Sequence, residues 1–94
     1  MNSFSLEILT PEKPFFKANV ESLIVKGSEG FLGILAHHAP LLARLAPGPL
    51  RIKQDNEEQV FAVGAGLVEV TPTGVTVLVD SAEPAARANT VKTP

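Results

Sequence analysis

Short apolar blocks, each interrupted by glycine, proline or charged residues, follow one another along the whole chain. In the first block Phe4, Leu6 and Ile8 alternate with Ser5 and Glu7, which is the period of two expected of a strand with one buried face. Further runs with strand composition cover residues 20–26, 50–54, 59–63, 67–70 and 75–79. Turn-forming residues separate these runs, so the pattern predicts an all-β fold, an antiparallel sandwich or barrel.

The most apolar of these runs is residues 75–79, where Thr76 is the only polar residue. A strand that is apolar on both faces is typical of the middle of a core. We therefore expect both faces of residues 75–79 to be buried.

Residues 31–46 allow two interpretations. Their apolar residues recur every three or four positions, as on one face of a helix: Leu32, Leu35, Ala39, Leu42 and Ala46. Gly33 weakens a helix there, and Pro40 would lose a backbone hydrogen bond and clash with the preceding turn. We therefore predict two short strands joined by a bend at residues 37–40. The remaining segment of helix-favouring composition is residues 82–88, which Pro84 interrupts.

The composition of the chain excludes several classes of protein. The chain has 94 residues, which is the size of one small domain, and 45% of them are apolar. A net charge of −2 excludes a strongly basic nucleic-acid-binding face, and the absence of cysteine excludes disulfides and thiolate metal sites. The N-terminus resembles no signal peptide, and no apolar run approaches the roughly 20 residues of a membrane-spanning helix. These features predict a cytoplasmic protein.

His37 and His38 are the only histidines. Adjacent side chains on a strand point to opposite faces, so two such rings do not bind one metal ion from within one strand. We expect histidines exposed at a bend or packed against a neighbour, and no metal site.

The remaining motifs that could bind a ligand or catalyse a reaction are also weak. Residues 63–66 contain two glycines, as in a dinucleotide-binding loop, but a strand-like run follows where that loop requires a helix N-terminus. We therefore expect these glycines to lie at a bulge or a tight reversal between strands.

Asp80 and Glu83 follow the most apolar strand, without a second carboxylate in a cleft, and we expect Asp80 to cap a strand end or turn. The chain offers no cysteine and no serine in a nucleophile elbow, so we predict no catalytic residues, no bound cofactor and no enzyme activity.

The bend region contains more leucine than a turn needs, at Leu41, Leu42 and Leu45. Two outcomes are open. Some of these side chains are exposed and mark a partner site, or all three are buried in the sandwich.

Five stretches in order, VKGSEGFLGIL at 25–35, HAPLLA at 38–43, LAPGPLRI at 45–52, VGAGLVEV at 63–70 and VTVLVDSAE at 75–83, resemble the epsilon subunit of F-type ATP synthases. The resemblance runs from about residue 4 to residue 83. It implies a flattened β-sandwich of about ten strands that serves as a non-catalytic part of the rotating central stalk. It also implies two partners, the gamma subunit and the polar loops of the membrane c-ring, and a peripheral place on the cytoplasmic face of the membrane.

The resemblance also assigns candidate contact residues. Those facing the c-ring are Glu29, Gly30, Phe31, His37 and His38, and those facing the gamma subunit are Thr10, Pro40, Leu41 and Leu42. This chain has Ala36 and His37 where relatives often have Pro-Gly, and Phe31 where they often have an acidic or other polar residue. The shape of the bend and the polarity of the c-ring contact are therefore expected to differ.

Residues 1–83 correspond to the sandwich domain, which leaves residues 84–94 as a short tail. Many family members continue into two C-terminal helices that inhibit ATP hydrolysis and in some cases bind ATP. We expect neither an inhibitory hairpin nor an ATP site on this chain. The alternative functions are a free-standing protein-binding module that shares only the fold, and a histidine-dependent metalloenzyme.

Overall fold

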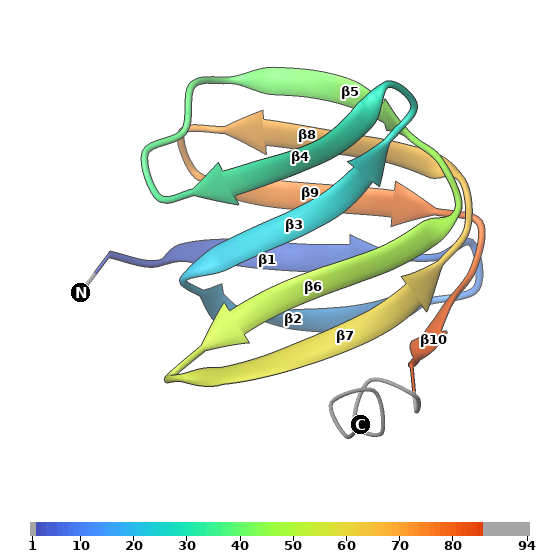
Figure 1. The fold of residues 1–94 in the computed structure, drawn as a ribbon, viewed down its shortest axis with the longest axis horizontal. Helices are drawn as coiled ribbons and strands as arrows, with labels where there is room; N and C mark the ends of the chain where they lie inside the picture. Colours follow the sequence, from blue (N-terminus) through green and yellow to red (C-terminus); the bar gives the residue numbers. More distant parts are fainter. Residues whose placement is uncertain (1, 86–94) are drawn as a thin grey trace.

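The computed structural model describes residues 2–85 and folds them into ten β-strands (Figure 1). The strands are β1 (Phe4–Leu9), β2 (Pro14–Val20), β3 (Ser22–Gly27), β4 (Gly30–Leu35), β5 (Leu41–Leu45), β6 (Gly48–Gln54), β7 (Glu57–Val63), β8 (Gly66–Thr71), β9 (Gly74–Val79) and β10 (Ala82–Pro84). The predicted all-β class is confirmed. Within this range there is no helix with the length and apolar character needed to cross a bilayer.

The strands form one curved, hydrogen-bonded sheet that folds back on itself into two layers. Its order is β10-β7-β6-β3-β5-β8-β9-β1-β2, with β4 paired to the free side of β3. In Figure 1 the layer of β4, β3, β6, β7 and β10 lies over the layer of β5, β8, β9, β1 and β2. Two hydrogen bonds close the open side, from Gln54 Nε2 to the Asn19 carbonyl oxygen (3.1 Å) and from the Glu21 amide to the Lys53 carbonyl oxygen (2.7 Å). All pairs are antiparallel except β1 with β9.

The core between the layers is built from alternate residues of the strands. Its buried side chains are Leu6, Ile8, Val20, Leu23, Val25, Ile34, Leu45, Leu50, Ile52, Phe61, Val63, Val68, Val70, Val75, Val77 and Val79. Phe15 packs edge-on against Phe61 at a ring separation of 5.2 Å, and Phe16 lies 5.3 Å from the same ring. Among residues 2–85 no polar side chain is buried, so the core is stabilised by apolar burial alone, at about 1.5–3 kcal/mol for each large side chain.

Two sequence-based expectations are wrong. Residues 20–26 are not one run, because Val20 ends β2 and the chain turns at Glu21 before β3. The expectation that residues 75–79 are buried on both faces also fails. Only Val75, Val77 and Val79 are buried, whereas Leu78 is 44% exposed. The outer face of β9 is in contact with solvent, so Leu78 belongs to the surface of the molecule and not to its core.

The predicted break of residues 31–46 into two strands is confirmed. β4 ends at Leu35 and β5 begins at Leu41, so the helical interpretation is excluded. Residues 64–65 link β7 to β8, so a strand follows the glycine pair, as expected. Of the segment with helix-favouring composition, residues 82–84 form β10, and residues 86–88 lie outside the described range.

Candidate interaction surfaces

The residues expected at the c-ring divide between the two ends of β4. Ser28 and Glu29 form the two-residue turn of the β3–β4 hairpin, and Gly30 starts β4 opposite Gly27. Gly30 has φ 130°, a conformation that side chains disfavour. Phe31 follows the tip, and its ring is 62% exposed. The hairpin therefore presents a carboxylate and an aromatic ring at one corner of the molecule.

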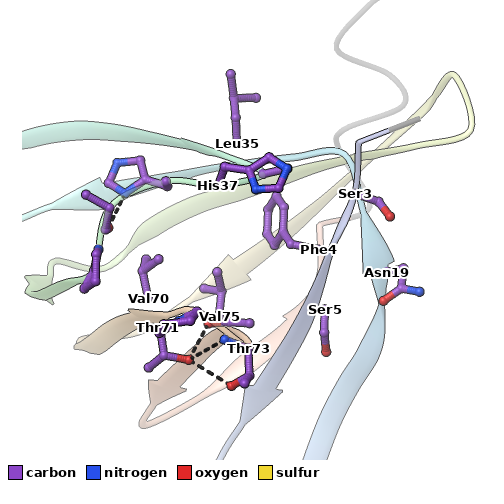
Figure 2. A pocket seen from close by; sticks show the side chains of 16 residues that line it. Ser3, Phe4, Ser5, Asn19, Leu35, His37, Val70, Thr71, Thr73 and Val75 are labelled. Carbon is purple, nitrogen blue, oxygen red and sulfur yellow. Dashed lines mark hydrogen bonds between the residues drawn. The ribbon is translucent and has the colours of Figure 1, made fainter.

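His37 and His38 lie in the turn after β4, beside a cavity of about 600 Å³ at the end of the sandwich (Figure 2). His37 has φ 66°, in the left-handed region. The Nδ1 atom of His38 lies 2.7 Å from the Ala39 carbonyl oxygen and can donate a hydrogen bond to it. In Figure 2 the side chain of Leu35 points away from Phe4 and the rest of the cavity. Both histidines are at a bend, as expected.

β4 separates the hairpin tip from the histidine turn. The strand is six residues long, which corresponds to roughly 20 Å at the usual rise per residue. The c-ring candidates therefore do not form one cluster. They mark the two ends of a single edge strand.

Thr10, a candidate for the gamma subunit, lies in the turn between β1 and β2. Its amide and its hydroxyl both donate hydrogen bonds to the Lys13 carbonyl oxygen, at 3.1 and 2.9 Å. Thr10 lines a shallow groove of about 350 Å³ together with Leu67 and Leu78. The Thr10 side chain thus shapes the turn, and the apolar groove beside it is available to a partner.

The other gamma candidates start β5 at the opposite end of the same layer. Leu42 is 66% exposed, Leu41 is half-buried, and Leu45 is only 4% exposed. Both open outcomes therefore occur, because Leu45 belongs to the core and Leu42 points outward. Pro40, Leu41 and Leu42 line a groove of about 360 Å³ with neighbouring residues of β8.

Of these gamma candidates, Thr10 and Leu42 border one outer face, whereas Leu41 packs against the core. We call the outward side of β5, β8, β9 and β1 the β8–β9 surface, with Leu9, Leu42, Arg44, Leu67, Glu69 and Leu78 as its principal residues. The register places Leu67 opposite Leu78 and Leu78 opposite Leu9. The c-ring candidates at the ends of β4 belong to the other layer. The two candidate sets nevertheless meet at β5, because the hairpin tip shares a pocket with Ala43 and Arg44. His37 and His38 likewise line one cavity together with Pro40.

Sequence reasoning missed four exposed apolar residues, Ile24, Leu35, Leu67 and Leu78. The alternation of side chains along a strand could have identified these exposed residues, since residues two positions apart share a face. Leu67 has the same parity as Glu69, and Ile24 the same as Lys26. An apolar residue in phase with charged neighbours on a strand therefore faces outward.

The described residues show no candidate metal site. No three His, Cys, Asp or Glu side chains in residues 2–85 gather closely enough to hold a metal ion. Asp80 and Glu83 are both exposed. The Asp80 amide donates a hydrogen bond to the Ala65 carbonyl oxygen (3.0 Å), so Asp80 lies where β9 and the β7–β8 link meet.

Comparison with known proteins gives a consistent result. The family model of the ATP synthase delta/epsilon chain β-sandwich domain matches residues 3–85. An ATP synthase epsilon chain from Chromohalobacter salexigens is 47% identical over 83 residues, covering 87% of this chain and 59% of the relative. The corresponding chain of Leptospira interrogans is 43% identical over 79 residues, covering 84% and 62%. This chain thus spans about three fifths of the length of these relatives.

Solved structures share the fold. A chain of the Euglena gracilis mitochondrial ATP synthase OSCP/F1/c-ring structure superposes with a TM-score of 0.83 at 22% identity, over 87% of this chain and 53% of that chain. A chain of the Tetrahymena thermophila ATP synthase central stalk/c-ring structure gives a TM-score of 0.76 at 22% identity, over 97% and 73%. Family match, sequence identity and fold agree, so the chain belongs to the ATP synthase delta/epsilon chain family and contains its β-sandwich domain.

Proposed function

We propose that the chain is a non-catalytic rotor subunit of an F-type ATP synthase, located in the central stalk between the c-ring and the gamma subunit. The observation that carries this proposal is the 47% identity to an ATP synthase epsilon chain over almost the whole sandwich. Ion flow through the membrane turns the ring, and the sandwich transmits that rotation to gamma. ATP is made on other chains.

The construction of the sandwich supports a mechanical role. A part that transmits torque must resist deformation, and one continuous sheet with two additional bonds across its open side limits sliding between the layers. Close-packed apolar cores have low compressibility. A lasting contact also needs apolar surface, which Leu42, Leu67 and Leu78 provide on the β8–β9 surface.

In this proposal the β8–β9 surface binds gamma, with Thr10 at one end and Pro40, Leu41 and Leu42 at the other. Glu29, Gly30 and Phe31 at the hairpin tip, and His37 and His38 at the histidine turn, face the polar loops of the c-ring. The protein reaches the membrane only through the complex, on its cytoplasmic face.

Co-purification tests the proposal. The chain is expressed with the gamma subunit of the same organism and analysed by size-exclusion chromatography. We expect a stable one-to-one complex. A chain that elutes alone at micromolar concentration, although it is folded by circular dichroism, would refute the rotor role and favour a free-standing binding module.

A further inference from the structure

β4 is an edge strand that carries none of the usual protection against pairing with another chain. Within residues 2–85 it is hydrogen-bonded only to β3. Its sequence, GFLGIL, contains neither the charges nor the prolines that usually block an exposed edge. The strands at the two ends of the sheet order, β2 and β10, each contain a proline, Pro14 and Pro84. β4 is therefore the edge most open to an additional strand.

The backbone groups of three β4 residues point toward this free edge. In an antiparallel pair, alternate residues bond to the neighbouring strand. The Lys26 carbonyl oxygen accepts a hydrogen bond from the Ala46 amide on the far side of β3 (2.9 Å), so Lys26 is not bonded to Phe31, the residue opposite it on β4. The same alternation turns the amides and carbonyl groups of Phe31, Gly33 and Leu35 away from β3.

The sequence of β4 is nearly symmetric about Gly33. Leu32 and Ile34 flank it and pack toward the core. Phe31 and Leu35 lie two positions away on the outer face, and each is 62% exposed. Antiparallel pairing with a second β4 about a two-fold axis at Gly33 would place Phe31 opposite Leu35 of the other copy, and Gly33 opposite Gly33. This register joins the three residues whose backbone groups point to the free edge.

We propose that two copies of the chain associate through antiparallel pairing of their β4 strands about a two-fold axis at Gly33. About six backbone hydrogen bonds join the copies, and Phe31 packs against Leu35 of the other copy on the outer face. The Leu35 carbonyl oxygen already accepts a bond from the His38 amide (3.2 Å) and has a second lone pair for the partner strand. The proposal concerns the free chain and does not depend on the rotor role.

The charge at the two ends of β4 favours this register. Continued beyond the strand, it brings the hairpin turn of one copy, which holds Glu29, toward the histidine turn of the other, which holds His37. Both side chains are exposed or half-buried and so accessible to a partner. A carboxylate then faces an imidazole at each end of the paired strands, and no two like charges meet there.

The remaining charges on this side lie too far from the axis to oppose pairing. Lys26 is on β3, so the Lys26 residues of two copies are separated by three strand spacings, roughly 14 Å. Arg51 and Lys53 are on β6, one strand further away, and Glu58 and Glu21 lie next to them. Exposed charges at such separations are largely screened at physiological salt, where the Debye length is about 8 Å.

The test measures self-association of the full chain. We expect sedimentation equilibrium to show monomers and dimers with a dissociation constant of about 100 µM, as suits a small interface. Between micromolar and millimolar protein, amide hydrogen exchange should slow at least 3-fold at Phe31, Gly33 and Leu35. The amides of Leu32 and Ile34, which face β3, should change less than 1.5-fold. A chain that is monomeric at millimolar concentration, or protection confined to β8 and β9, would overturn the proposal.

A proline at the axis provides the matching test on the protein side. Gly33→Pro removes the amide hydrogen that points to the free edge. Gly33 has no positive φ and open space at its Cβ position, so an edge strand should accept the change. We expect a folded chain by circular dichroism that dimerises at least 10-fold more weakly, whereas Gly33→Ala keeps the amide and should dimerise within 3-fold of the unmodified chain.

A dimer as stable in Gly33→Pro as in the unmodified chain would show that another surface joins the copies, and the proposal would be wrong. If Gly33→Pro does not fold, the exchange rates of the unmodified chain decide by themselves, because they require no substitution.

Discussion

At the scale of single residues, the backbone at His37 and at Gly66 limits which side chains this fold accepts. His37 adopts φ 66° in the turn after β4, although it is not glycine. Left-handed backbone costs a residue with a side chain about 1–2 kcal/mol relative to the common conformations. The chain therefore carries local strain in the turn after β4.

His37→Gly should stabilise the protein. Glycine adopts this φ without steric cost, and this gain exceeds the added entropy of the unfolded chain, so we expect the free energy of unfolding to rise by about 0.5–1 kcal/mol. Urea denaturation followed by circular dichroism measures the change. His38→Gly is the matched control, because His38 has no positive φ and its ring can bond to the Ala39 carbonyl oxygen. A loss of stability in His37→Gly would show that the imidazole ring contributes more by packing than the turn costs.

Gly66 is constrained by space. It starts β8 opposite Val79, and a Cβ atom there would collide with the carbonyl oxygen of Leu78, a backbone atom that cannot rotate away. Gly66→Ala should therefore lower the free energy of unfolding by about 2 kcal/mol or more. Gly33→Ala, at a site with open space, should be neutral or slightly stabilising in the same denaturation experiment. Equal effects of the two substitutions would contradict the close approach of β8 and β9.

At the scale of the elements, the alternation of apolar and polar residues predicted most strands, and the exceptions have physical causes. β2 was missed because it begins with Pro14, and because the consecutive Phe15 and Phe16 interrupt the alternation of apolar and polar residues. Proline is tolerated there because β2 is an edge strand, at the end of the sheet order. The parallel pairing of β1 with β9 joins the two ends of the chain, and no local pattern contains that information.

The candidate surfaces were predictable only in part, because the sequence does not state directly which face of a strand the fold turns inward. The resemblance supplied turn residues and the exposed Phe31 and Leu42, but the run of apolar residues placed both faces of residues 75–79 in the core. Leu78 shows the limit of that rule, since it is apolar and yet 44% exposed. Burial of a strand residue depends on which face the layer turns inward, and only the parity of its charged neighbours reveals that face in sequence.

β5 allows a direct comparison of its two faces. Leu45 is 4% exposed and Leu42 is 66% exposed, three residues apart on the same strand. Leu45→Asp should abolish folding, because it places a carboxylate without a partner in the core, at a cost of several kcal/mol. Leu42→Asp should change the free energy of unfolding by less than about 0.5 kcal/mol. Thermal unfolding distinguishes the two, and a large destabilisation in Leu42→Asp would place that side chain in the core.

At the scale of the whole molecule, the fold separates two apolar surfaces. The β8–β9 surface combines Leu42, Leu67 and Leu78 with the charges of Arg44 and Glu69. A second apolar surface lies on the outer face of β3 and β4 and is formed by Ile24, Phe31 and Leu35. Because the strands carrying them belong to opposite layers, a partner can cover one surface and leave the other accessible. The two surfaces approach each other at β5, where the hairpin tip shares a pocket with Ala43 and Arg44.

The separation makes the assignment of gamma to one layer testable. If gamma covers the β8–β9 surface, Leu42→Asp and Leu67→Asp each place a carboxylate in an apolar contact near Glu69, which adds repulsion between like charges. We expect each substitution to weaken gamma binding at least 10-fold in a titration monitored by calorimetry. Phe31→Asp, on the other layer and 62% exposed, introduces the same charge and should alter the affinity by less than 2-fold. The reverse ranking would assign gamma to the β3–β4 side.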